Sequence, residues 1–203
     1  MFKYSKKILA SLLALMTVLA VGSNFVPAKA AAPIVLDQEN ASITTGLSEE
    51  EIAGLLFMRE EEKLARDVYN QLYTIWGQPI FKNIAASEQT HMDQIKILLD
   101  RYGLTDPALA PGQFADPILQ ALYNQLLAQG SLSLADALNV GALIEKTDIA
   151  DLQAHVTQTD QAVIQLVYNN LMNASYNHLA AFTGTQSQGG NDNGKGRGNS
   201  PKH

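Results

Sequence analysis

Glutamate and histidine stand three residues apart at Glu88 and His91, a spacing that places both side chains on one face of an α-helix. Such a pair can offer a metal ion one carboxylate oxygen and one imidazole nitrogen from a single helix. Alone it is a weak signal, because Glu and His three apart are also common as exposed helix pairs. The case for a metal site therefore depends on what other segments place opposite this pair.

Three further polar residues occupy positions where an apolar side chain is expected. Glu62 follows Met58 and precedes Ala65 at the four- and three-residue spacing of a buried helix face. Glu145 and His178 interrupt apolar series of the same kind in two later segments. Four segments thus each carry a polar group near the middle of the face that should be buried.

Several carboxylates converging in one core would unfold a small domain unless a cation neutralised them, since an unpaired buried carboxylate costs several kcal/mol. Carboxylate oxygens with one imidazole per ion suit iron or manganese better than copper. The sequence therefore predicts an iron or manganese site, with room for two ions. Its predicted ligands are Glu62, Glu88, His91, Glu145 and His178.

Purely structural or solvent-exposed roles for these polar residues remain open. Glu60, Glu61 and Glu62 are three consecutive acidic residues, and such a run usually lies on a solvent-exposed helix face. Only Glu62 is in register with the apolar face, and we expect Glu60 to be solvated. His178 could be a core histidine bonded to a backbone carbonyl. Lys63 and Arg66 fall off the buried face. We rank Asp148 last among the candidate ligands and expect structural or exposed roles for Ser175, His155 and His203.

The elements that must position these residues are helices. Apolar residues recur at three- and four-residue spacing in every long segment, and no segment alternates with period two long enough to form a sheet. The fold class is therefore all-α. Capping residues, glycines and prolines delimit long helices near residues 48–76, 80–102, 133–156 and 160–183, and a short helix near 117–129.

Connection lengths predict how these helices pack. Tight turns should make the first and second long helices, and the third and fourth, antiparallel neighbours. A connection of roughly 30 residues, which contains the short helix, joins the two hairpins. The prediction is an up-down-down-up four-helix bundle with one long crossover, the ferritin-like arrangement.

The positions of the candidate ligands along the bundle axis predict that the two hairpins bind metal unequally well. If the first hairpin reverses near Gln78, Glu62 and His91 lie within about one turn of each other. If the second reverses near Gln158, Glu145 and His178 differ by about 9 to 12 Å at 1.5 Å per residue. A second ion should therefore be held less well than the first.

These segments resemble a known family. Residues 62–69 (EKLARDVY) are similar to the first-helix motif of ferritins, and residues 87–92 (SEQTHM) to their second-helix Glu-x-x-His. The stretch 59–182 resembles the ferritin-like family of domain of unknown function 2202. The resemblance implies that Glu62 binds metal and that Tyr69 lies beside it. The fourth helix departs from the di-iron pattern, because Ser175 stands where a bridging Glu is expected.

The N-terminus predicts export. Lys3, Lys6 and Lys7 precede an apolar run, and small residues at Ala28 and Ala30 suit a signal peptidase, which gives a signal peptide over residues 1–30. The predicted domains are a linker or arm over 31–47, a four-helix domain over 48–184 and a disordered Gly/Asn-rich tail over 185–203. After cleavage no membrane span is expected, and the localisation is secreted or extracytoplasmic.

Charge and composition limit the kinds of partner and metal site that can be expected. Removal of the leader takes away four lysines, leaving 10 basic against 20 acidic residues and a net charge near −10. Such a surface repels phosphate backbones, so nucleic acid is not an expected partner. The absence of cysteine in the chain excludes disulfides and thiolate metal sites. The sequence does not decide between a monomer and a homodimer.

Two functions fit this sequence. The first is an exported ferritin-like protein that binds iron or manganese and acts as an oxidase or handles peroxide or oxygen. The second is a non-catalytic exported bundle, a binding or envelope module with a degenerate metal site. Ser175 favours the second, whereas buried acids without a compensating Lys or Arg favour the first.

Overall fold

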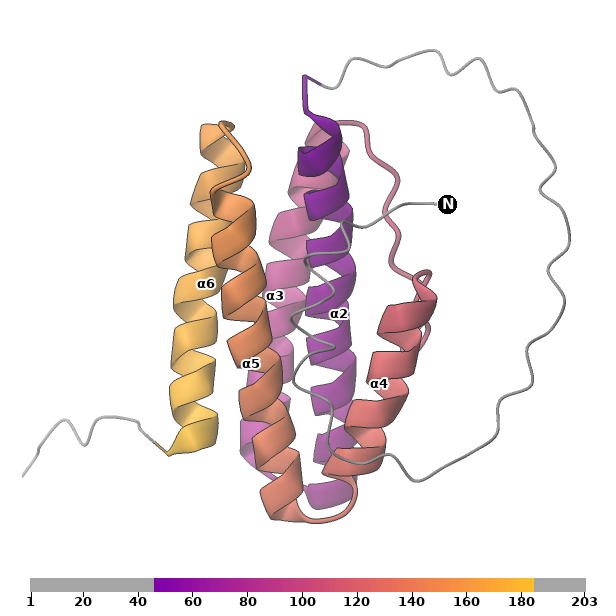
Figure 1. Ribbon diagram of the computed structural model, residues 1–203. Coiled ribbons are helices and arrows are strands. Elements are labelled where there is room, and N and C mark those ends of the chain that lie inside the picture. The colour runs from indigo at the N-terminus through magenta and orange to yellow at the C-terminus, as the bar shows by residue number, and fades with distance from the viewer. Residues whose placement is uncertain (1–45, 185–203) are drawn as a thin grey trace, which may run out of the picture.

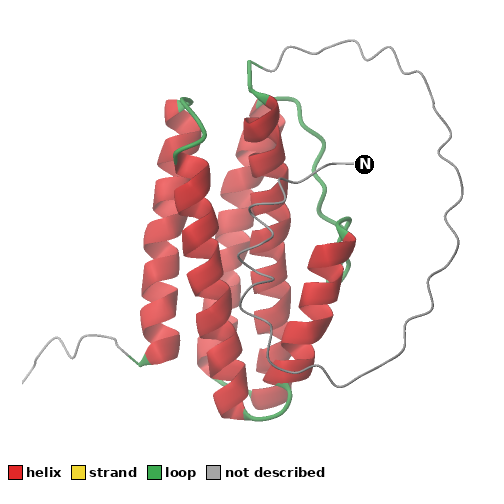
Figure 2. Ribbon diagram, in the orientation of Figure 1, coloured by secondary structure: helices red, strands yellow, loops and turns green. Residues whose placement is uncertain are grey.

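The computed structural model describes residues 46–184, and this part of the chain is helical without strands (Figure 2). Its elements are α2 (Glu49–Trp76), α3 (Pro79–Arg101), α4 (Pro117–Gly130), α5 (Leu134–Val156) and α6 (Ala162–Thr183). The predicted all-α class is confirmed, and each helix begins and ends within about two residues of its predicted limits.

Local sequence explains where the helices end. Ser48 and Glu51 form a capping box, in which each side chain accepts a hydrogen bond from the backbone N–H of the other. Gly77 closes α2 at a φ of 64°, a left-handed conformation that favours glycine. The next helix starts two residues later at Pro79, so α2 and α3 form a tight hairpin.

The two hairpins pack side by side (Figure 1). α2 pairs with α3, α5 pairs with α6, and the crossover carries the chain from one end of the bundle to the other, so α3 and α5 run in the same direction. This is the predicted up-down-down-up order. The short helix α4 lies against α2 and α5 within the crossover. α2 therefore has neighbours on three sides.

Aliphatic and aromatic side chains fill the space between the hairpins. Each fully buried side chain of this kind contributes roughly 1.5–3 kcal/mol relative to exposure. Tyr69 and Phe182 pack with ring centroids 5.2 Å apart. Gly141 allows this arrangement, because a methyl group on it would lie 2.5 Å from the Phe182 ring. α5 and α6 can thus approach closely at the level of Tyr69.

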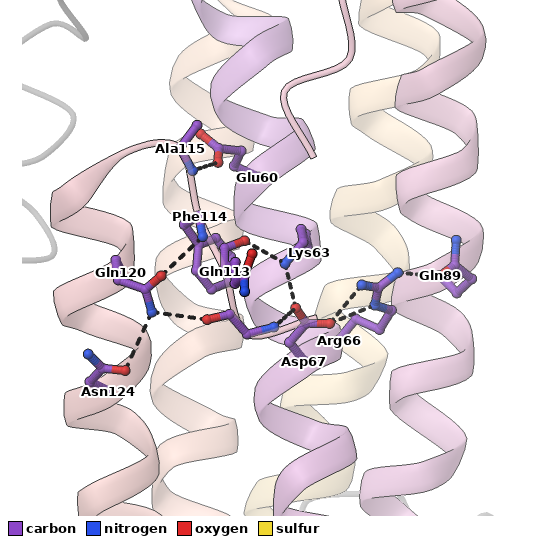
Figure 3. A network of polar contacts seen from close by, with 11 residues as sticks. Glu60, Lys63, Arg66, Asp67, Gln89, Gln113, Phe114, Ala115, Gln120 and Asn124 are labelled. Atoms are coloured by element: carbon purple, nitrogen blue, oxygen red, sulfur yellow. Dashed lines mark hydrogen bonds and ion pairs between the residues drawn. The ribbon is translucent and has the colours of Figure 1, made fainter. Parts of the chain in front are cut away.

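The crossover is fastened to α2 by buried charges (Figure 3). The Lys63 ammonium donates to Asp67 Oδ2 at 2.6 Å and to the carbonyl of Gln113 at 2.9 Å. It also lies 4.1 Å from the centre of the Phe114 ring. Asp67 in turn accepts from the backbone N–H of Gly112 at 2.9 Å. Lys63 and Asp67 therefore hold the connection between the hairpins in place.

The expectation that Glu60 is solvated is wrong. Glu60 is fully buried, and its Oε1 accepts a hydrogen bond of 2.8 Å from the backbone N–H of Ala115. Lys63 and Arg66 lie off the apolar face as expected, but the crossover covers Lys63 completely. The reason is that the crossover buries a second face of α2, which helical periodicity alone does not reveal.

Other expectations concern regions beyond these helices. The predicted signal peptide, most of the predicted arm and the predicted tail lie outside the described residues. Between residues 46 and 184, no helix has the length and apolar character needed to cross a membrane.

Candidate metal centre

The hairpin of α2 and α3 brings three of the predicted ligands together. His91 Nδ1 lies 3.1 Å from Glu62 Oε2 and 2.8 Å from Glu88 Oε2. All three side chains are buried. Their ligand atoms lie within 4.8 Å of one another, which is close enough for one ion to contact all three.

A second group of ligands joins the two hairpins. His178 Nδ1 on α6 lies 2.9 Å from Glu88 Oε1 on α3 and 3.3 Å from Glu145 Oε2 on α5. These three ligand atoms also lie within 4.8 Å of one another. The structure therefore brings together all five residues that the sequence singled out.

Glu88 belongs to both groups through different oxygen atoms. Its Oε2 faces His91 and its Oε1 faces His178. The two imidazole rings are stacked, with centroids 5.5 Å apart. A carboxylate with one oxygen toward each of two ligand groups has the geometry of a bridge between two ions.

The predicted height mismatch between Glu145 and His178 is wrong. The two α-carbons are offset along the axis, since Glu145 stands nearer the turn between α5 and α6 than His178 does. Helical side chains lean toward the N-terminus of their helix, however. Glu145 thus leans away from the turn and His178 leans toward it, and their polar atoms meet at 3.3 Å.

The donor set fits divalent cations. Ligand atoms about 2.1 Å from an ion and at right angles to each other are about 3.0 Å apart. The nitrogen–oxygen distances across the centre, 2.8, 2.9, 3.1 and 3.3 Å, lie around this value. Glu62 Oε1 is buried without a hydrogen-bond partner. Buried polar atoms of this kind are costly unless something else, such as a cation, satisfies them.

Two neighbours orient the ligands of the second group. The Tyr69 hydroxyl donates to Glu145 Oε1 at 2.6 Å, which leaves Oε2 for the centre. Ser87 Oγ lies 3.0 Å from His178 Nε2. A histidine that donates from Nε2 to Ser87 keeps the Nδ1 lone pair directed at the site. Tyr69 was anticipated from the sequence; Ser87 was not, although it stands one residue before Glu88 on the same helix.

Protons balance the charge of the centre while no cation is bound. Burial by itself lowers the pKa of His91, but the charges and hydrogen bonds of Glu62 and Glu88 outweigh it and raise the pKa to about 11. The contacts of His178 with Glu145 and Glu88 likewise overcome burial and raise its pKa to about 9. Burial raises the pKa of Glu88, yet the two histidines lower it to about 2. The metal-free centre is thus an ionised carboxylate between two imidazolium groups.

The pKa values of Glu145 and Glu62 are raised, in contrast to that of Glu88. Burial is the main cause that raises the pKa of Glu145 to about 7, against the opposing effect of His178. Burial and the charge of Asp148 raise the pKa of Glu62 well above its usual range. Binding of a cation would release the protons that these groups hold.

Three residues that ranked low in the sequence are buried in the structure. Asp148 is buried beside Ser175 on α6, and its negative charge acts on Glu62. Ser175 is fully buried and donates to the carbonyl of Leu171, which agrees with a structural role. His155 is also buried, and burial lowers its pKa to about 4, so it is neutral at pH 7.

Glu61 and Asp151 are not among the predicted ligands. Both are nevertheless buried, and they interact with each other between α2 and α5. A signal was present for Glu61, which shares a helix face with Phe57, Leu64 and Val68. That apolar face indicated a second buried side of α2.

An open pocket of about 680 Å³ lies beside the centre, between α3 and α6. Asn83 and Ile84 line it from α3, and Asn177 and His178 from α6. The His178 side chain is 11% exposed, the largest fraction among the five ligands. Small molecules can therefore approach the centre at this histidine.

Comparisons with known proteins agree with this architecture. A curated relative, uncharacterized protein MJ0754 of Methanocaldococcus jannaschii, is 54% identical over 138 residues, which cover 67% of this chain and 75% of that protein. The crystal structure of hypothetical protein MJ0754 from Methanococcus jannaschii superposes with a TM-score of 0.67 at 47% identity, covering 77% of this chain and 85% of the other. The profile of the family described as uncharacterized protein domain (DUF2202) matches residues 51–195. With most of its length matched by that profile, the chain belongs to the DUF2202 family.

Proposed function

We propose that this chain is a ferritin-like protein that binds two iron or manganese ions in the core of its bundle. One ion would be held by Glu62, Glu88 and His91, and the other by Glu88, Glu145 and His178. The observation that carries this proposal is the position of Glu88, whose two oxygens face two different histidines at 2.8 and 2.9 Å.

Each ion of such a pair could give up one electron, so two ferrous ions would supply the two electrons that reduce dioxygen to peroxide or peroxide to water. The protein would hold the two ions at a fixed separation through Glu88. Tyr69 would keep Glu145 oriented, and the pocket at His178 would admit the oxidant. The chain has no cysteine for an internal electron relay, so repeated turnover needs an external reductant.

Replacement of the shared ligand tests the dinuclear centre. Glu88→Gln keeps the size of the side chain but removes its charge, and we expect both ions of the centre to be lost. The measurement is the metal-to-protein ratio by mass spectrometry after chelation and reloading with Mn²⁺. Glu50→Gln, the same change at an exposed residue of α2, is the control and should leave the ratio unchanged. An unchanged ratio in Glu88→Gln would refute the centre.

A second candidate function is a non-catalytic module that keeps a degenerate site. The buried serine at position 175, where a bridging carboxylate would be expected, favours it. Oxygen consumption after addition of ferrous ion to the stripped protein separates the candidates. Uptake of oxygen that Glu88→Gln abolishes supports an oxidase, whereas tight metal binding without oxygen uptake supports the module.

We also propose that the protein is exported. Residues 1–30 contain basic residues, then an apolar run and then small residues, which is the order found in a signal peptide. Protein collected outside the producing cells should begin at Ala31 or within a residue or two of it, as determined by mass spectrometry. Finding only intact protein that starts at Met1 inside the cells would contradict export.

A further inference from the structure

The pocket between α3 and α6 is larger than dioxygen or peroxide requires. Its volume is about 680 Å³, whereas a water molecule occupies about 30 Å³ in the liquid. Pockets of roughly 300–1,000 Å³ are those in which proteins bind organic molecules. His178, a proposed ligand of the second ion, lies in the wall of this pocket. An organic molecule bound there would therefore lie next to the centre.

The walls of this pocket show which kind of molecule it suits. Besides His178, they consist of aliphatic side chains, two carboxamides and a glycine, namely Ile80, Ile84, Ala181, Asn83, Asn177 and Gly184. None of these described lining residues is Lys, Arg, Asp or Glu. A charged group would lose water here without gaining a partner of opposite charge, and the net charge of −6 further disfavours anions. The walls suit an uncharged, partly apolar molecule.

One of the two carboxamides favours a hydroxyl group on that molecule. The Asn177 side-chain nitrogen already donates to the carbonyl of Asn173 at 3.1 Å. Its Oδ1 remains as a hydrogen-bond acceptor, which a hydroxyl donor would satisfy. Asn177 also directly precedes His178 in the chain, so a hydroxyl bound by Asn177 would be held close to a ligand of the second ion.

Turnover of the proposed centre requires electrons from outside the chain. The sequence has no cysteine, so neither a thiol nor an iron–sulfur cluster of this protein can supply them. Nicotinamide nucleotides and ascorbate are anions, for which the described walls of the pocket offer no Lys or Arg. Hydroquinones are uncharged and aromatic, carry two hydroxyl groups and give up two electrons. They match both the walls of the pocket and a pair of ions that each accept one electron.

We propose that this pocket binds a hydroquinone that reduces the dinuclear centre between turnovers, and we name it the reductant pocket. The inference rests on the proposed function, because it requires two redox-active ions beside His178. One hydroquinone would lose two electrons and two protons and leave as the quinone, and the two oxidised ions would each gain one electron. The protons would pass to water at the open mouth of the pocket. Oxidant and reductant would use the pocket in turn.

Binding of resorcinol to the Mn²⁺-loaded protein tests the reductant pocket without any reaction. Resorcinol is an isomer of hydroquinone that cannot form a quinone, and Mn²⁺ broadens the resonances of nearby ligand protons. We expect this broadening with the wild type. Ala181→Phe fills the pocket from α6 and should lower the affinity roughly tenfold or more. Ala162→Phe, the same change at an exposed position at the other end of α6, should bind as the wild type does.

Anaerobic mixing tests the reaction itself. Ferric-loaded wild type mixed with hydroquinone should form one benzoquinone for every two ferrous ions. Ala181→Phe should slow this reduction roughly tenfold or more, because the added ring takes the place of the hydroquinone. Ala162→Phe should not slow it. Equal rates in all three proteins would show that electrons enter the centre elsewhere and would overturn the proposal.

The metal content separates failure of this proposal from failure of the centre. All three proteins should hold the same amount of Mn²⁺, because neither alanine is a ligand. A wild type that holds two Mn²⁺ but does not broaden resorcinol, or an Ala181→Phe variant that binds resorcinol as tightly as the wild type, would overturn the reductant pocket alone.

A wild type that binds no Mn²⁺ would overturn the proposed function instead. Calorimetry of resorcinol with the stripped wild type would then decide the pocket by itself: binding would support a site for phenols, and absence of binding would overturn that site as well. If circular dichroism shows that Ala181→Phe is unfolded, Asn83→Phe replaces it. Asn83 lines the pocket from α3 at an exposed position, and the same loss of affinity is expected there.

Discussion

At the scale of single residues, the position of Glu88 depends on the length and the chemistry of its side chain. Its two oxygens reach His91 on the same helix and His178 on the last helix. Gln would offer one oxygen and one amide nitrogen, and the nitrogen cannot bind a cation. Asp would be one carbon shorter and could not reach both histidines from the same backbone position. Glu62 and Glu145 each serve one group only.

Tyr69 acts on the second group through Glu145. Because its hydroxyl donates to Glu145 Oε1 at 2.6 Å, Tyr69→Phe should leave that carboxylate free to rotate. We expect the second Mn²⁺ of the centre to bind roughly 10- to 100-fold more weakly, with the first unaffected. Titration calorimetry of the stripped protein measures both steps.

Tyr73→Phe, one turn later on α2, is the matched control for Tyr69→Phe and should behave as the wild type. An equal loss of affinity at both positions would mean that Tyr69 supports the fold rather than Glu145. No loss at all would mean that Glu145 needs no partner.

At the scale of elements, two ion pairs of the same geometry are predicted to differ in strength. Lys63–Asp67 and Lys96–Asp100 are both four residues apart in a helix, and both measure 2.6 Å. The first pair is buried beneath the crossover and the second is exposed. Asp67→Asn would leave a buried ammonium unpaired and should cost about 3–5 kcal/mol of unfolding free energy. Asp100→Asn should cost less than about 1 kcal/mol.

Urea unfolding of the two variants measures this difference, at saturating Mn²⁺ so that the state of the centre is constant. The Mn²⁺ content of folded Asp67→Asn should match that of the wild type, because Asp67 faces the crossover and not the centre. Similar losses of stability in the two variants would show that the crossover does not depend on the buried pair.

The elements were predictable because caps, glycines and periodicity act locally. Ser48, Gly77 and Ser133 fix helix ends through their own backbone neighbours, whatever the rest of the chain does. The burial of Glu60 and Lys63 was not predictable in this way. It depends on the path of the crossover, and the amides and carbonyls that bind these residues come from about 50 positions further along the chain.

The centre was predictable because a polar residue in the middle of an apolar helix face is conspicuous. All five predicted ligands converge for that reason. The offset between Glu145 and His178 was misjudged because heights of α-carbons ignore the direction in which side chains lean. Glu61 was missed because it stands in a run of charges, where exposure is the usual outcome.

At the scale of the whole molecule, the metal-free protein should lose stability as the pH rises. In the folded state, the pKa of Asp148 is raised to about 8 by burial and by Glu145, and those of His178 and His91 are raised to about 9 and about 11. The folded protein then holds more protons than the unfolded chain. Each contribution is complete below the unfolded pKa and is lost as the pH passes the folded one.

Melting temperatures of the stripped protein should therefore fall between about pH 6 and about pH 9. Glu88 and His155, whose pKa values are lowered to about 2 and about 4, act in the opposite direction only at more acidic pH. Since cations compete with these protons, added Mn²⁺ should raise the melting temperature more at about pH 8 than at about pH 6. A melting temperature that rises with pH in the stripped protein would contradict the assigned protonation states.

The division of ligands between the two hairpins has a mechanical consequence. The first group lies entirely on α2 and α3, whereas the second draws Glu88 from one hairpin and Glu145 and His178 from the other. An ion in the second group would thus be a cross-link that closes a loop of roughly 60 residues, a constraint for which chain entropy gives about 4 kcal/mol. In a chain without cysteine, such an ion would take the place of a disulfide. It would be a link that reductants leave intact and chelators undo.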